Sequence, residues 1–125
     1  MYGSKMKSEE TDHLFEAILS LKDLEECYRF FDDLCTFSEI QAMTQRLQVA
    51  EMLEAGNTFS QISKEIGVSS ATITRVNKCI SYGADGYKIV LKRMKEKHAH
   101  EYGEPYRIRP GWTAGPVFRV AACSS

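Results

Sequence analysis

The chain has 125 residues, a length that suits one domain, and 43% of them are hydrophobic, which is enough for a core. It has no run of the roughly 20 apolar residues that span a bilayer, and its first residues do not form a secretory signal, so we expect a cytoplasmic protein without membrane contact. The net charge of −1 hides an asymmetry: residues 1–55 carry a net −7, whereas residues 56–97 carry eight Lys and Arg against three Asp and Glu. The basic segment is a candidate surface for a polyanion.

Composition divides the chain into three segments. Residues 1–10 are predicted to be a flexible arm, and residues 11–97 carry helical patterns throughout. All three prolines fall in residues 98–125, where no helical or strand period survives. We therefore expect an irregular tail there, which is disordered, loosely docked or not native to the protein.

Two amphipathic helices and a longer third helix are predicted first. The first helix starts near Ser8 or Thr11, and the second starts near Asp23, with apolar residues at spacings of three and four. Thr36 and Glu39 have the spacing of a capping box, which opens a third helix reaching about residue 55. Its expected inward side chains are Ile40, Met43, Leu47, Ala50 and Leu53.

Three further helices are predicted after residue 57. Thr58 and Gln61 form a second capping box, which opens a fourth helix that Gly67 ends. A fifth helix is capped by Ser69 or Ser70 and reaches about residue 80. The sixth runs from about residue 84 to residue 97, and its expected inward side chains are Tyr87, Val90, Leu91 and Met94.

The fourth and fifth predicted helices have the spacing of a helix-turn-helix, in which two short helices cross at a tight turn. Gly67 occupies the turn, where a positive φ is common, and Ser63 is the small residue expected where the helices touch. The steep crossing also requires apolar residues at fixed offsets from the turn. The chain supplies Ile62, Ile66, Val68, Ile73 and Val76.

The outward side of this unit carries hydroxyl, amide and basic groups, which bond to phosphates and to base edges in the major groove. The amino terminus of the fifth helix adds free backbone amides and a positive dipole end. We therefore predict sequence-specific DNA binding. The candidate contacts are Thr58, Ser60, Gln61, Ser69, Ser70, Thr72, Thr74, Arg75 and Lys78. The alternative is a protein-interaction module, in which the same unit docks on a partner.

Other chemistry finds little support in the sequence. No nucleophile, acid and base form a catalytic motif, and no glycine-rich phosphate loop is present, so we do not expect an enzyme. His98 and His100 do not share a helix face, so we predict no metal site. The four cysteines have no zinc-site spacing and are predicted to be reduced core thiols. They are Cys27, Cys35, Cys79 and Cys123.

Several segments together carry a family likeness: LCTFSEI at 34–40, QRLQVAEML at 45–53, Gly56, Ile66 with Gly67, and the specific run ATITR at 71–75. Across residues 11–97 the chain resembles the Trp repressor family, and within it the YerC/YecD-type branch. The resemblance implies a six-helix, all-α fold and an intertwined homodimer whose amino-terminal helices build a shared core. It also implies a transcriptional regulator, a repressor acting by occupancy, on near-palindromic DNA sites.

The resemblance further implies a corepressor pocket between the reading head and the dimer core, which holds L-tryptophan in the family. Arg46 and Arg75 match the two arginines that hold the ligand, and Thr36 and Thr72 match further lining positions. An alternative use of Arg46 is an ion pair with a nearby carboxylate, that of Glu51 or Glu54.

Two pocket positions depart from the family pattern. Val76 replaces a small glycine and adds volume where a ring would lie, and Cys79 replaces a serine with a poorer hydrogen-bonding group. Both changes argue against L-tryptophan. We expect either a different small ligand or no corepressor.

Overall fold

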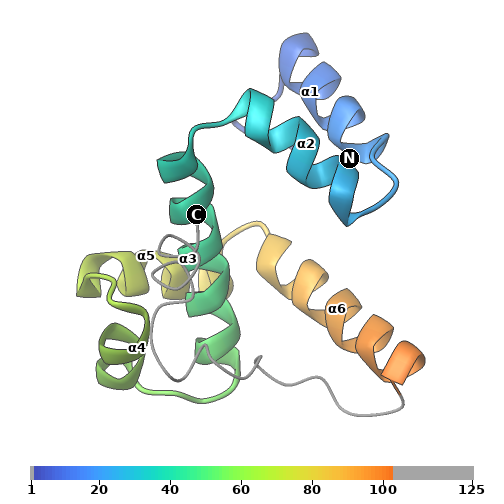
Figure 1. Cartoon of the computed structure of the whole chain (residues 1–125). Helices are drawn as coiled ribbons and strands as arrows, with labels where there is room; N and C mark the ends of the chain where they lie inside the picture. Colours follow the sequence, from blue (N-terminus) through green and yellow to red (C-terminus); the bar gives the residue numbers. More distant parts are fainter. Residues whose placement is uncertain (1, 103–125) are drawn as a thin grey trace. The chain divides into compact units, whose positions relative to one another are not determined.

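The computed structural model describes residues 2–102, and this part of the chain folds into six α-helices without strands (Figure 1). The all-α prediction with six helices is confirmed. No helix in the described range is long and apolar enough to cross a membrane. The elements are α1 (Glu9–Leu19), α2 (Leu24–Leu34), α3 (Phe37–Glu54), α4 (Phe59–Ile66), α5 (Ser70–Tyr82) and α6 (Gly86–Tyr102).

Two capping boxes fix the starts of α3 and α4, as the sequence predicts. The N–H of Thr36 donates to Glu39 Oε1 at 2.8 Å, and the N–H of Glu39 donates to Thr36 Oγ1 at 3.2 Å. Thr58 and Gln61 exchange the same two bonds, at 2.8 Å and 3.2 Å. These reciprocal bonds satisfy amides that a helix start leaves without partners. Single side chains cap α1, α2 and α5, namely Ser8, Asp23 and Ser69.

Two helix ends and one segment boundary differ from their expected positions. Helix α1 begins at Glu9, close to its expected start, so the segment expected to be a flexible arm, residues 1–10, is too long at its end. Helix α5 continues to Tyr82 before Gly83, and α6 continues to Tyr102, past its expected end at residue 97. No glycine or proline lies between residues 87 and 102 to stop α6. The rest of the expected tail, residues 103–125 with Cys123, lies outside the described residues.

The helices belong to two compact units, one ending at Ile40 and the other beginning at Gln41. The amino-terminal unit contains α1, α2 and the first residues of α3, and neither α1 nor α2 holds a buried residue. The carboxyl-terminal unit contains the core. Its buried hydrophobic residues are Val49, Ala50, Met52, Ile62, Ile66, Val68, Ile73, Val76 and Leu91.

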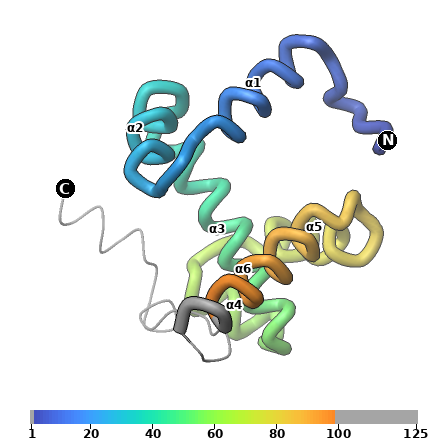
Figure 2. The backbone as a smooth tube through the Cα atoms, turned by 90° about the vertical axis from the view of Figure 1, so that its right-hand side faces the viewer, coloured from blue at the N-terminus to red at the C-terminus, as the bar shows by residue number. Residues whose placement is uncertain are grey.

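One segment of α3 is buried on every side, because each of residues 48–52 is at most 4% exposed. Helices α4, α5 and α6 are arranged around this segment of α3 in Figure 2. The expected inward stripe of α3 was only partly right: Ala50 is buried and Leu47 and Leu53 pack against the core, but Met43 is exposed. The core also contains Val49 and Met52, which were not expected to face inward. A stripe describes a helix that packs on one face, whereas residues 48–52 are enclosed by other helices.

The cap of α4 can be tested by replacing Thr58 with alanine. We expect Thr58→Ala to lower the free energy of unfolding by about 1 kcal/mol, because the backbone N–H of Gln61 loses the threonine hydroxyl as its acceptor. Thr74→Ala makes the same chemical change at an exposed position inside α5 and should leave stability unchanged or slightly higher. Urea unfolding of both variants measures the difference, and equal losses would contradict the capping role.

The cap of α3 should make stability depend on pH. The hydrogen bond from the Thr36 backbone, followed by that with its hydroxyl, lowers the pKa of Glu39 below its ordinary value. A lowered carboxylate pKa stabilises the folded state above the unfolded pKa, and this contribution disappears as pH falls through the folded pKa. We therefore expect the wild type to exceed Glu39→Gln in melting temperature at neutral pH, and this difference to disappear as pH falls through the folded pKa of Glu39. A difference independent of pH would contradict this.

Candidate nucleic-acid interface

Helices α4 and α5 form the predicted helix-turn-helix (Figure 1). Gly67 adopts the left-handed conformation at φ 79°, which a side chain would strain. The hydroxyl of Ser63 donates to the carbonyl of Val68 at 3.0 Å, so this small residue ties α4 to the chain beyond the turn. The five apolar positions required by the motif are all buried, as predicted: Ile62, Ile66, Val68, Ile73 and Val76.

The side chains of α5 separate into rows because residues three and four apart share a helix face. Ile73 and Val76 face the core and are almost completely buried. Ser70, Thr74 and Lys78, which we call the outer row, are spaced by four residues and are all exposed. The buried row fixes the helix in place, and the outer row is available to a partner along the whole length of α5.

Several candidate contact residues also have local structural roles. The hydroxyl of Ser69 accepts from the N–H of Thr72 at 3.2 Å, and the two hydroxyls lie 3.2 Å apart. Thr58 and Gln61 form the capping box of α4, and Ser60 is exposed in the first turn of that helix. These residues therefore set the two helix starts, where backbone amides and the positive dipole end favour an anion.

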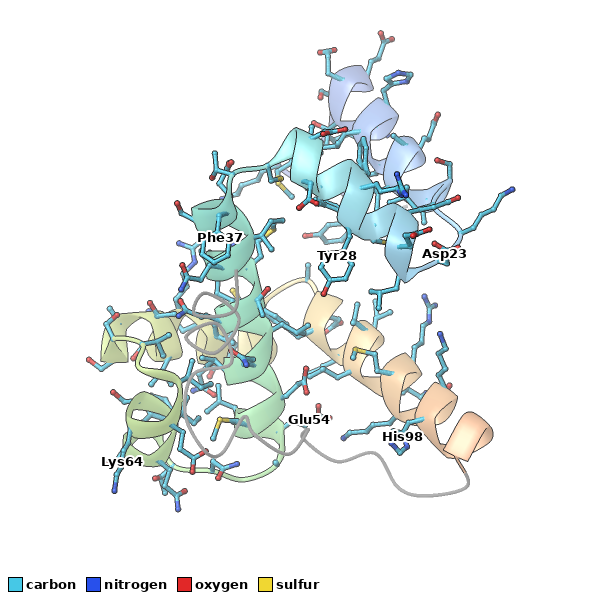
Figure 3. All side chains as sticks on the ribbon, in the orientation of Figure 1. Asp23, Tyr28, Phe37, Glu54, Lys64 and His98 are labelled. Atoms are coloured by element: carbon cyan, nitrogen blue, oxygen red, sulfur yellow. The ribbon has the colours of Figure 1, made fainter. Side chains whose placement is uncertain are left out.

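The positive charges of α5 and α6 differ in their surroundings. On α6, Lys95 pairs with Glu54 at 3.1 Å, and Lys88 lies 3.7 Å from Asp85. Figure 3 labels Glu54 at the end of α3. Within the described residues, Arg75 and Lys78 of α5 form no ion pair. Lys92 and Arg93 of α6 are also exposed and form no ion pair among the described residues, so uncompensated positive charge lies on both helices and could attract an anionic partner.

A cavity of about 440 Å³ lies among α3, α5 and α6, and its lining is mostly apolar. Leu47 contributes from α3, Cys79 from α5, and Tyr87 with Val90 from α6. Cys79 is exposed, so its expected place in the core was wrong. It follows the buried Val76 by three residues but lies near the end of α5, where it lines this cavity. Cys27 and Cys35 are half-buried.

The other expected pocket residues have separate positions. Val76 is in the core, Thr72 is half-buried at the start of α5, and Thr36 belongs to the amino-terminal unit. Arg46 and Arg75 both lie close enough to the phenol of Tyr87 to influence its ionisation.

The sequence prediction missed Tyr87 as part of this site. Burial raises the pKa of Tyr87, and this effect exceeds the lowering by the nearby Arg46 guanidinium. Cys79 raises the pKa further and Arg75 lowers it. One signal was available, since Tyr87 is the only expected inward residue of the sixth helix with a polar group. A polar tip on an apolar face usually has a partner.

Comparison with known proteins agrees with this architecture. The model of the Trp repressor protein family matches residues 9–95. YerC of Bacillus subtilis strain 168, a protein described as uncharacterized, is 60% identical over 96 residues, which are 77% of this chain and 92% of YerC.

Two solved structures share the fold. One is that of a candidate Trp repressor from Staphylococcus aureus, with 51% identity and a TM-score of 0.69 over 72% of this chain and 90% of that one. The other is a TrpR-like protein from Eubacterium eligens ATCC 27750, with 49% identity and the same TM-score over 72% and 93%. The match of the family model over most of the chain, together with these relatives, shows that the chain belongs to the Trp repressor family.

Proposed function

We propose that this chain is a sequence-specific transcriptional regulator that binds near-palindromic DNA sites as an intertwined homodimer and represses by occupancy in the cytoplasm. Its membership of a family of DNA-binding regulators supports the general part of this proposal. The observation that carries it is the outer row of α5, which is exposed to solvent together with Arg75. The opposite side of the same helix is buried in the core.

The chemistry of this surface fits the major groove of DNA. Ser70 and Thr74 offer hydroxyls that both donate and accept, and Arg75 can form two parallel bonds to guanine. Lys78 carries a point charge suited to a phosphate. The capped start of α5 offers backbone amides to a second phosphate. No described group of three or more His, Cys, Asp or Glu side chains converges on a metal site, and the proposed function requires none.

The amino-terminal unit supports the dimer. Large apolar side chains of α1 and α2 are exposed in the single chain, including Leu19 at 83%, Leu24 at 72% and Tyr28 at 66%. Figure 3 labels Tyr28, whose ring extends away from the axis of α2. Helices of 11 residues are marginal in water unless an apolar face is packed. A second copy of the chain would present the same faces and could cover them symmetrically.

DNA binding can be tested first by selecting genomic fragments with the purified protein at two salt concentrations. We expect enrichment of a few near-palindromic fragments that persists at the higher salt. Arg75→Ala should weaken binding to these fragments more than to random DNA. Lys78→Ala should weaken binding to both kinds of DNA, and it should reduce the slope of log affinity against log salt concentration by about one. Fluorescence anisotropy with labelled fragments measures these affinities.

Lys64→Ala is a matched control for the loss of one charge, because Lys64 lies on α4 and outside the outer row (Figure 3). It should change affinity less than either substitution on α5. If neither α5 variant changes affinity, the assigned face is wrong. If all fragments bind weakly and are released by salt, specific DNA binding is contradicted, and docking of the helix-turn-helix on a protein partner becomes the leading function.

The dimer can be tested with two neighbouring substitutions on α2 that each shift the net charge by −1. Tyr28→Asp places a charge on the exposed apolar face, and we expect it to convert dimer to monomer at micromolar concentration. Arg29→Ala removes only an exposed pair with Glu25 at 3.8 Å and should remain dimeric. Sedimentation velocity distinguishes the species, and a wild type that is monomeric throughout would contradict the proposal.

A further inference from the structure

Tyr87 of α6 lies where α3, α5 and α6 meet. Its side chain lines the 440 Å³ cavity together with Leu47 and Cys79. It also lines a second cavity, of about 290 Å³, together with Leu53 of α3 and Ile80 of α5. It packs against the core cluster as a partly buried residue. The ring therefore lines two spaces on the same three helices, and its removal would leave α6 with fewer contacts to both α3 and α5.

Both arginines beside this ring act on its phenol. The guanidiniums of Arg46 on α3 and Arg75 on α5 both lower the pKa of Tyr87, so both lie near its phenol. Glu54, one of the carboxylates expected to pair with Arg46, is bonded to Lys95 instead. The two guanidiniums at this site thus face a group that belongs to the chain itself.

We propose that Tyr87 is a positioning residue, an internal aromatic group that fixes α5 against α3 and α6, so that specific DNA binding by this chain requires no small-molecule corepressor. This inference rests on the proposed DNA-binding function. A phenol suits the task because its ring fills apolar space while its oxygen can accept a hydrogen bond from a guanidinium. Arg75 adjoins the outer row, so a displaced phenol would disturb the DNA-contacting surface directly.

The test uses the full-length protein and a fragment enriched in the genomic selection. The wild type should bind this fragment with the same affinity with or without L-tryptophan or 4-methylphenol, which is the tyrosine side chain as a free molecule. Tyr87→Phe keeps the ring but loses the oxygen, and it should bind about threefold to tenfold more weakly. Tyr87→Ala should bind more weakly still, while its salt-dependent binding to random DNA changes little.

Chemical rescue distinguishes positioning from general destabilisation. Added 4-methylphenol should restore fragment affinity to Tyr87→Ala, since a truncated apolar site binds a small aromatic molecule of matching shape. It should have no effect on Tyr82→Ala, the matched control, because Tyr82 is 89% exposed at the end of α5. Circular dichroism checks that each variant is folded.

If Tyr87→Ala does not fold, a double-mutant cycle of Tyr87→Phe with Arg46→Met decides the question. The two losses in affinity should then be clearly less than additive, as expected for groups in contact. The inference is overturned if the wild type needs an added small molecule, if Tyr87→Phe binds like the wild type, or if the cycle is additive. Failure to enrich any fragment would instead remove the proposed function on which the inference rests.

Discussion

The enclosure of one helical segment determines the arrangement of the carboxyl-terminal unit. Residues 48–52 of α3 are buried on every side, so α4, α5 and α6 must each pack against this segment to shield it from water. The position of α5 follows from that requirement, because Ile73 and Val76 can be buried only if α5 lies against the same core. The exposed side of α5 is then determined by the side that is buried.

Local chemistry made much of the fold predictable from the sequence. The capping boxes at Thr36 and Thr58 and the left-handed turn at Gly67 depend on residues no more than three positions apart. Such features are readable because hydrogen-bonding groups and backbone preferences act over short sequence distances. The apolar offsets of the helix-turn-helix were equally clear, because the motif allows only one crossing geometry.

The predictions from the sequence failed for features that depend on several neighbouring helices or side chains at once. The burial of Val49 and Met52 follows from how many helices surround α3, which its own periodicity does not reveal. The role of Tyr87 depends on Arg46, which is 41 positions earlier in the chain. The expected contact and pocket residues lie at known positions now, but which of them touch DNA or a ligand stays a prediction.

The separation of the α5 side chains into rows has a consequence for how this protein could diverge. The outer row makes no contribution to the core, so replacements at Ser70 or Thr74 would alter the groups presented to a partner without changing how the helix is held. Ile73 and Val76 do not share this freedom, since their volume is fixed by close packing. Relatives could therefore acquire different target sites through a few surface replacements while keeping the same thermal stability.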